Sequence, residues 1–327
     1  MHIINQPPPP IQPFIQTNIP LADKNWFRTG GIARYYCEPT NDQEFQIALA
    51  YAQDNNLQVF VLGQGANILI SDDGFDGLVI RPQLKKIYIS TQQTNAPYVL
   101  VNAQAGVTMH ELIEYCLEHN IIGLEEFSGI PSTIGGAVFI NLHYFQFLLD
   151  QFLAGAQIIN KQTGATAAVL PDWFNFGYDQ SQLHAQDYYL VNATFMLKKA
   201  TDIETAYAKG RRIEIIRHRA QRYPQTHTCG SFFRNFHEHE VTLVSNNKKM
   251  IYVAYYLDKI GIKGALQIGG ATVSYQHANM IVNQGNATSN DIVQLARTMQ
   301  QKVYDSFGII PQPECQLIGF KEWPLLQ

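Results

Sequence analysis

The feature that most constrains the fold is a glycine loop between two apolar runs, residues 59–62 and 68–70. Both runs are short and partly β-branched, which predicts a strand, a tight turn and a second strand. Gly63 and Gly65 have no Cβ, so the backbone between the strands can turn sharply and expose its N–H groups. Successive exposed N–H groups form a concavity that suits phosphate. Because a third glycine and a following helix are missing, the loop is not a Rossmann fingerprint, and an ordinary glycine hairpin remains the alternative.

A second glycine-rich segment covers residues 123–138. In it, Pro131, Ser132 and Thr133 precede the pair Gly135-Gly136, which predicts a turn that leads into a helix. The amino end of a helix attracts anions through its free N–H groups and its dipole. Two such loops in one chain favour a dinucleotide ligand, and the alternative is that both loops pack against neighbouring backbone.

Composition narrows the class of protein. The chain has 327 residues, enough for two or three domains, and its net charge of −4 gives no basic excess for binding nucleic acid. The four cysteines show no CxxC spacing, which predicts free, buried thiols and no zinc or other metal. Neither a signal peptide nor an apolar run of about 18 residues is present, so we expect a cytoplasmic protein with no membrane partner.

The order of elements predicts an α+β fold, because helices and strands follow each other without strict βαβ alternation. Helices are predicted over residues 45–55, 107–119, 203–222, 250–260 and 292–307. Four consecutive prolines begin at Pro7 and cannot enter a helix or a sheet interior, so residues 1–20 are predicted to form an extended arm. The arginine-rich helix at 203–222 is interpreted as a solvated face.

Six segments in this order resemble one family, the UDP-N-acetylenolpyruvoylglucosamine reductases (MurB). They cover residues 27–33, 62–67, 128–137, 230–235, 261–264 and 273–279, and Pro313-Glu314 follows them. The resemblance spans about residues 20 to 320 and implies a flavin domain of the vanillyl-alcohol-oxidase (PCMH) type. It implies FAD-binding subdomains at 21–85 and 86–200 and an α+β substrate domain at 201–327.

The resemblance also implies an activity. Such an enzyme reduces UDP-N-acetylglucosamine enolpyruvate to UDP-N-acetylmuramate in peptidoglycan synthesis, with noncovalent FAD and with NADPH as the reductant. The expected partners are the small UDP-sugar and NADPH, and the expected state is a monomer. One alternative is a catalytically impaired relative that keeps the fold. Another is a flavin oxidase for a different sugar, although no flavin-linking His or Cys can be identified.

The resemblance assigns a role to each matching site residue, position by position. Ser231 matches the proton donor, Glu314 matches the glutamate that stabilises the enol or enolate, and Tyr178 lies in the third catalytic motif. A hydroxyl is a poor acid in water, so Ser231 must be aligned with the developing carbanion. The residues that match substrate contacts are Arg234, Asn235 and His277. The residues that match FAD contacts are Leu62, Gly63, Gln64, Gly65, Ala66, Asn67, Ser128, Gly129, Ile130, Pro131, Ser132, Gly135 and Gly136.

The chain departs from the family at its third catalytic residue. The family has an arginine after the tyrosine, and this chain has Asp179, which reverses a charge expected to face the substrate carboxylate. An active enzyme therefore needs another cation, and His143 and His184 are the candidates. Bulky Leu142 and His143 also stand where the family has small residues, and Ser132 replaces a glycine. From the sequence alone, Asp179→Arg is expected to raise kcat/KM.

Overall fold

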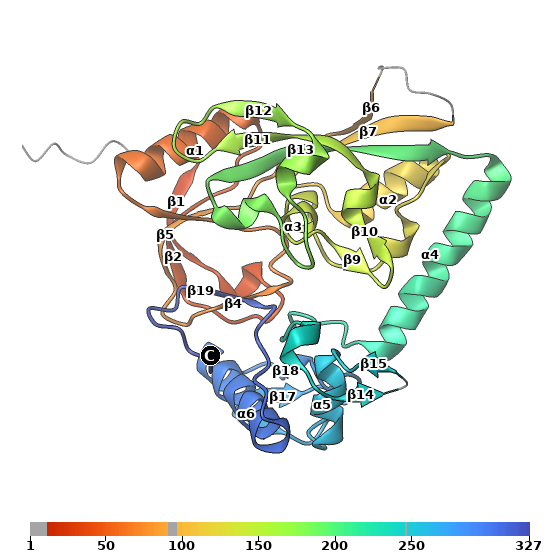
Figure 1. The fold of residues 1–327 in the computed structure, drawn as a ribbon. Helices are drawn as coiled ribbons and strands as arrows, with labels where there is room; N and C mark the ends of the chain where they lie inside the picture. Colours follow the sequence, from red (N-terminus) through yellow and green to blue (C-terminus); the bar gives the residue numbers. More distant parts are fainter. Residues whose placement is uncertain (1–11, 91–96, 246) are drawn as a thin grey trace, which may run out of the picture. The chain divides into compact units, whose positions relative to one another are not determined.

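The computed structural model describes residues 12–90, 97–245 and 247–327. Helices and sheets are mixed along this part of the chain (Figure 1), which confirms the α+β class. The chain forms two compact units that interleave in sequence. Unit 1 contains the residues up to Ile19, Ala33–Gly63 and Asp76–Ile216, and unit 2 contains Pro20–Ile32, Gln64–Phe75 and Arg217–Gln327. The domain boundaries at residues 20, 85 and 200 stay predictions.

Unit 1 contains a four-stranded sheet with one helix packed on it. Its strands, in spatial order, are β1 (Ile15–Pro20), β2 (Ile32–Cys37), β5 (Phe75–Ile80) and β3 (Gln58–Val61). Helix α1 (Asp42–Asp54) begins at Asn41, whose side chain accepts the N–H of Glu44. Its buried Phe45 and Leu49 pack with Val59. The predicted arm is thus a strand from residue 15 onward, and residues 1–11 lie outside the described residues.

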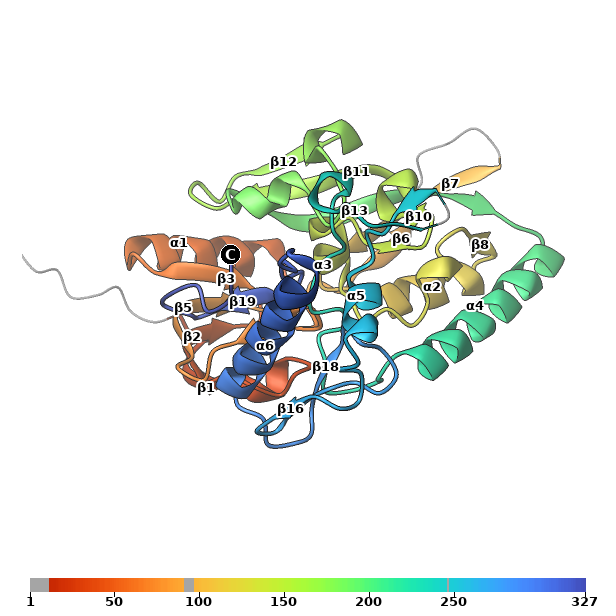
Figure 2. The same ribbon diagram turned by 60° about the horizontal axis from the view of Figure 1, so that its bottom comes forward.

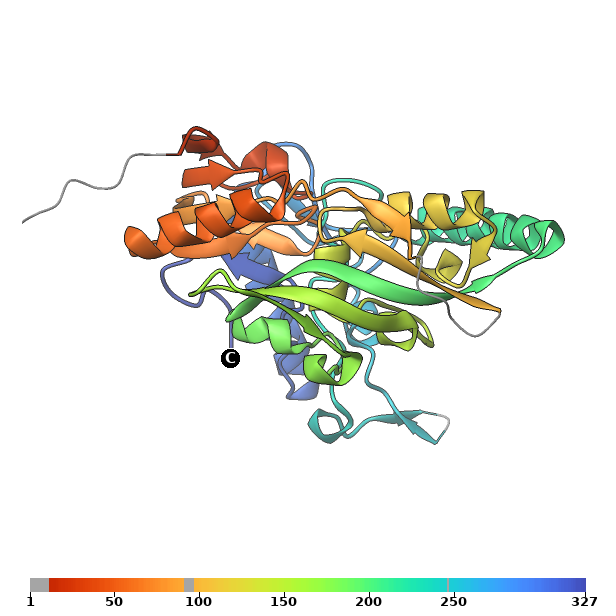
Figure 3. The ribbon, with the colours of Figure 1, turned by 90° about the horizontal axis from the view of Figure 1, so that it is seen from above.

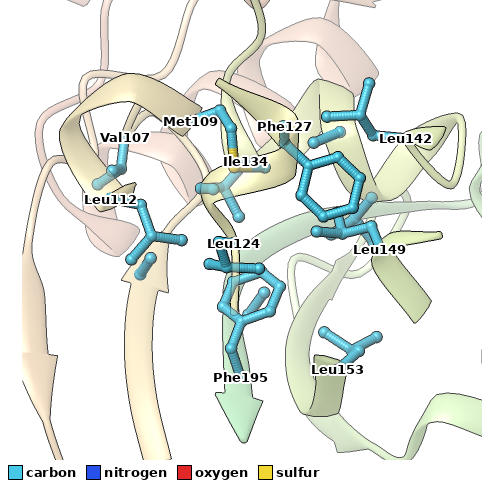
Figure 4. Packing of buried hydrophobic residues seen from close by; sticks show 14 of the residues in the cluster. Val107, Met109, Leu112, Leu124, Phe127, Ile134, Leu142, Leu149, Leu153 and Phe195 are labelled. Carbon is cyan, nitrogen blue, oxygen red and sulfur yellow. The ribbon is translucent and has the colours of Figure 1, made fainter. Parts of the chain in front are cut away.

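The larger sheet of unit 1 is antiparallel throughout. Its strands, in spatial order, are β12 (Thr166–Val169), β11 (Leu153–Asn160), β13 (Tyr188–Lys199), β7 (Tyr98–Gln104) and β6 (Ile87–Ile89), with β8 (Ile121–Ile122) also paired to β13. The long green strands β11 and β13 run side by side in Figure 3. Helices α2 (Met109–Glu118) and α3 (Ile134–Phe139) bury Met109 and Ile134 against Phe127 and Phe195 (Figure 4). This core fixes both ends of α3, on which the site described below depends.

Unit 2 is built around a small sheet and a long helix. The sheet contains β16 (Gln267–Ile268), β17 (Ala271–Val273) and β18 (Ile281–Asn283). Helix α6 (Ser289–Phe307) packs on β16 and β17 and touches α5 (Val253–Lys259), as Figure 2 shows. Thr288 and Asp291 form the capping box that begins α6, and Gly308 ends it with a φ of 71°. The buried faces of α5 and α6 form the unit's core.

The alternative interpretation of the first glycine loop as a hairpin is wrong. The strands on either side of the loop exist, but β3 pairs in parallel with β5, whereas β4 (Ile68–Ile70) pairs in parallel with β19 (Gln316–Ile318). Short apolar runs do not specify their partners, and here each run pairs in parallel with a strand other than its neighbour across the loop. The loop is therefore where the chain passes from unit 1 to unit 2.

The long helix α4 (Asp202–Arg222) was predicted as a solvated basic face, and this is only partly right. Arg211 donates two hydrogen bonds to the carboxylate of Glu126, at 2.7 and 2.9 Å, and Arg212 pairs with Glu114. These pairs fasten α4 to unit 1. Among the described residues, no helix is both long and apolar enough to cross a membrane.

The remaining elements are short. Two hairpins pair β9 (His143–Tyr144) with β10 (Phe147–Leu148) and β14 (Val244–Ser245) with β15 (Lys248–Lys249). The 3-10 helices are η1 (Ala22–Lys24), η2 (Glu125–Phe127), η3 (Leu149–Phe152), η4 (Pro171–Phe174), η5 (Gln182–Ala185) and η6 (Glu238–Glu240).

Candidate active site

The glycine loop presents backbone donors. Within the described part of the chain, the backbone N–H groups of residues 63–67 have no hydrogen-bond acceptor. Gly65 has a φ of 67°, and a Cβ there would lie 2.7 Å from the carbonyl oxygen of Lys24. Only glycine fits this position without moving the backbone. A run of unused amides in a bent loop is the arrangement that binds an anionic oxygen.

Three buried side-chain oxygens in these segments also lack a hydrogen-bond partner among the described residues. Thr29 Oγ1, Asn67 Oδ1 and Ser128 Oγ make no hydrogen bond to any described residue. Buried polar atoms are rarely left unpaired, because each costs about 1–3 kcal/mol. All three lie in segments that carry the family resemblance. Within unit 2, the free amides of residues 64–67 and the oxygens of Thr29 and Asn67 fit a large polar cofactor such as FAD.

The second glycine segment, residues 123–138, does not present the free helix amides that were predicted. The amides of the first turn of α3 are already used, because Ile134 donates to Val107 O at 2.7 Å and Gly135 donates to Ala105 O at 2.9 Å. The N–H of Gly136 donates to Thr133 Oγ1 at 3.2 Å. The expectation that this helix end attracts an anion through free amides is therefore wrong. A Cβ at Gly63 would lie 2.7 Å from Thr133 Oγ1, so close packing explains that glycine.

The other residues predicted to contact FAD occupy varied positions. Leu62 is buried and donates to Ile80 O at 2.8 Å, so its role is to anchor the loop. Gly129 is exposed with a φ of 76°, and Ser132 Oγ donates to Thr133 O at 2.9 Å. The half-buried members of the set are Gln64, Ala66, Ile130 and Pro131.

Unit 2 brings Ser231 and Glu314 onto neighbouring backbone segments. The carbonyl oxygen of Phe232 accepts the N–H of Glu314 at 2.9 Å, and Phe233 forms an antiparallel bridge with Pro313. Ser231 itself forms an antiparallel bridge with Met280. Both residues are half-buried. Glu314 is therefore hydrogen-bonded to the residue that follows Ser231 in the chain.

Asn279 holds this arrangement, and the sequence analysis missed its role. Its side chain accepts the N–H of Phe233 at 3.1 Å and donates to the carbonyl oxygen of the same residue at 2.7 Å. It is 3% exposed, and a buried amide of this kind usually clamps backbone. The sequence feature that could have indicated this role was the asparagine at the end of segment 273–279.

Arg234, predicted to bind substrate, already has a carboxylate partner. Its guanidinium donates to both oxygens of Glu240, each at 2.8 Å. This bidentate pair lowers the pKa of Glu240 to about 2. The neighbouring Asn235 accepts the N–H of Val253 at 3.3 Å, so both side chains are oriented by unit 2 itself.

His277 is a neutral residue at physiological pH. Burial lowers its pKa to about 4, and the charges of Arg222 and Lys263 act in the same direction. Its Nδ1 accepts the N–H of Asn279 at 3.3 Å. As a predicted substrate contact it can offer a hydrogen bond rather than a charge.

Tyr178 and Asp179 form the tip of a tight turn in unit 1. The N–H of Gly177 donates to the carbonyl oxygen of Gln180 at 3.0 Å. Asp179 has a φ of 52°, a conformation that Asp and Asn tolerate better than longer side chains. Its Oδ1 lies 3.3 Å from His143 Nδ1, and the Tyr178 ring lies 4.8 Å from the ring of His143.

Comparison with known proteins decides the family. Residues 33–166 match the model of an FAD binding domain, and residues 221–318 match that of the UDP-N-acetylenolpyruvoylglucosamine reductase C-terminal domain. The UDP-N-acetylenolpyruvoylglucosamine reductase of Synechococcus sp. (strain JA-3-3Ab) is 34% identical over 95% of this chain and 94% of the relative. The chain belongs to this reductase family. The reductase of Orientia tsutsugamushi (strain Ikeda) is 31% identical over 93% of this chain and 94% of the relative.

A solved structure agrees with the reductase family. The crystal structure of MurB from Thermus caldophilus has a TM-score of 0.72 at 23% identity, and the match covers 93% of this chain and 100% of that chain. The fold is therefore that of the reductases. The resemblance drawn from the sequence is confirmed, and the protein is an FAD-dependent oxidoreductase of this class.

Proposed function

We propose that this protein reduces UDP-N-acetylglucosamine enolpyruvate to UDP-N-acetylmuramate with NADPH, in the synthesis of peptidoglycan precursors. The observation that carries the proposal is the backbone hydrogen bond between Glu314 and Phe232, the neighbour of Ser231, in a chain that matches a reductase over 95% of its length. When bound, FAD would supply the hydride-transfer chemistry between NADPH and the enolpyruvyl group. The protein supplies position, charge and the proton.

Ser231 donates that proton to C2. Gly230 precedes it with a φ of 82°, and no atom lies within 4 Å of the position of a Cβ there, so the backbone beside the hydroxyl stays accessible. Glu314 stabilises the enol or enolate from the neighbouring segment. Because both segments are fixed by backbone bonds and by Asn279, the two groups are positioned before the substrate binds.

In unit 2, FAD would be held by the amides of residues 64–67 and by the buried oxygens of Thr29 and Asn67. Arg234, Asn235 and His277 would contact the UDP-sugar. Glu240 restricts the guanidinium of Arg234 to one orientation, so the pair presents a fixed donor rather than a mobile charge. The proposal includes NADPH as the reductant, a cytoplasmic location and a monomeric state with no nucleic-acid partner.

The test is a direct assay of the product. Purified FAD-containing protein is incubated with NADPH and UDP-N-acetylglucosamine enolpyruvate, and the nucleotide sugar is analysed by mass spectrometry. The expected product is heavier than the substrate by two hydrogens, and NADPH deuterated at the transferred position places one deuterium at C3. Oxidation of NADPH without this product would contradict the proposal.

A further inference from the structure

The two departures from the family pattern meet in unit 1. Asn141 donates to the carbonyl oxygen of Gly177 at 3.4 Å and to the carboxylate of Asp150 at 3.1 Å. Ser181 Oγ donates to the carbonyl oxygen of Phe139, the last residue of α3, at 2.6 Å. The hairpin at 143–148 and the turn at 177–180 are therefore built together on the carboxyl end of α3.

Asp179 and His143 form a close pair in unit 1. The Asp179 side chain is 14% exposed, and neither carboxylate oxygen makes a hydrogen bond to a described residue. The His143 ring, 3.3 Å away, is the basic group in ion-pair contact with it. A buried carboxylate without hydrogen bonds is costly unless a positive charge lies beside it. Among the described residues, the His143 ring is the group placed to offset that cost.

The other charged groups near the pair already have hydrogen-bond partners. Asp150 is bound by Asn141, and Glu126 on η2 is bound by Arg211. His184 is a poor rival for the positive charge, because burial lowers its pKa and its ring stacks on Phe139 at 3.9 Å. Its Nδ1 also accepts the N–H of Ser181 at 3.2 Å. His143 is thus the better of the two candidate cations.

The pair lies close enough to loop 128–133, which is predicted to contact FAD, for one ligand to reach both. Helix α3 joins loop 128–133 to the pair and has six residues, a length of about 9 Å. The side chain of His143 is 27% exposed, and Tyr178 beside it is 43% exposed. With Nδ1 facing Asp179, Nε2 has no acceptor among the described residues and can donate to an anion.

We propose that His143, oriented by Asp179, donates a hydrogen bond from Nε2 to the carboxylate of the enolpyruvyl substrate. His143 is then a catalytic residue, and Asp179 is a positioning residue that acts through it. His143 thereby makes the carboxylate contact that the residue at position 179 cannot make. This inference rests on the proposed function, because it needs a carboxylated substrate.

The test compares two ligands that differ in the carboxylate. Isothermal titration calorimetry on FAD-containing protein gives the Kd of UDP-N-acetylmuramate, which carries a carboxylate, and of UDP-N-acetylglucosamine, which does not. The ratio of these two values is measured for wild type, His143→Gln, His143→Lys and Asp179→Asn. His184→Gln is the matched control, since it removes the other histidine near the turn. FAD content and Tm verify the fold of every variant.

We expect His143→Gln to lower the preference for the carboxylated ligand by about 10- to 100-fold, the range for a hydrogen bond to a charged group. His143→Lys should restore most of that preference, Asp179→Asn should lower it, and His184→Gln should leave it unchanged. An unchanged preference in His143→Gln, or an equal loss in His143→Lys, would overturn the inference. If His143→Gln does not fold, an unchanged ratio in Asp179→Asn overturns it.

Failure here is distinct from failure of the proposed function. If wild type forms the reduced product but His143→Gln keeps the ligand preference and kcat/KM, only the role of His143 is wrong. If wild type forms no product, the proposed function itself is wrong.

Discussion

His277 should make the stability of unit 2 depend on pH, and the size of the effect follows from its pKa. The folded protein holds this pKa at about 4, whereas an unfolded histidine has a value of about 6.5. Between these values the unfolded chain binds more protons, so the free energy of unfolding falls as the pH falls. The contribution of neutral His277 to the free energy of unfolding is complete above about pH 6.5 and is lost by about pH 4. At pH 4.5 the loss is about 2.5 kcal/mol.

The perturbation that tests this is His277→Asn, which keeps an acceptor for the N–H of Asn279 but cannot be protonated. Urea unfolding of both proteins is measured at pH 7.5 and pH 4.5. The drop in unfolding free energy should be about 2.5 kcal/mol smaller in the variant. His239→Asn, which changes an exposed histidine, should behave like wild type. Equal pH dependence in wild type and His277→Asn would refute the reasoning from burial.

Three further substitutions test other parts of the account. Gly65→Ala should lower the free energy of unfolding by about 1–3 kcal/mol and weaken FAD retention on gel filtration, because Gly65 has a φ of 67° and an added Cβ would contact Lys24. Gly210→Ala, which has open space around it, should do neither. Ser231→Ala should leave bleaching of the flavin by NADPH intact and slow substrate reduction by about 10²–10⁴-fold in stopped-flow, and equal slowing of both steps would make the serine structural. Asp179→Arg should lower kcat/KM, because it removes the partner of His143 and strains the turn at a φ of 52°; a gain would restore the expectation from sequence alone.

Much of the fold could be predicted from local patterns. The capping residues Asn41 and Thr288 begin α1 and α6, and such caps can be predicted because a cap acts within its own turn. The pairing of strands could not be predicted, as the glycine loop shows: β3 and β4 carry the same kind of apolar run but belong to different sheets. A strand's partner is decided by contacts far away in the sequence, which a local pattern does not contain.

The site was predicted unevenly for a similar reason. The resemblance identified Ser231 and Glu314, and the structure places them on adjacent segments, although 82 residues lie between them in the numbering. The amides of α3 were expected to be free, because the sequence does not reveal that Val107 and Ala105 accept them. Likewise, Asp179 and His143 were read as two separate departures, because only the fold brings their segments together.

The central claim is that this chain is a working enolpyruvyl reductase despite Asp179. The most direct measurement follows the visible spectrum of the FAD-containing protein in the absence of oxygen. One equivalent of NADPH should bleach the flavin, and UDP-N-acetylglucosamine enolpyruvate should then restore the absorbance and yield UDP-N-acetylmuramate. UDP-N-acetylglucosamine, which lacks the enolpyruvyl group, should leave the protein bleached. A flavin that NADPH bleaches but that the enolpyruvyl substrate does not reoxidise would contradict the claim and identify a catalytically impaired member of the family.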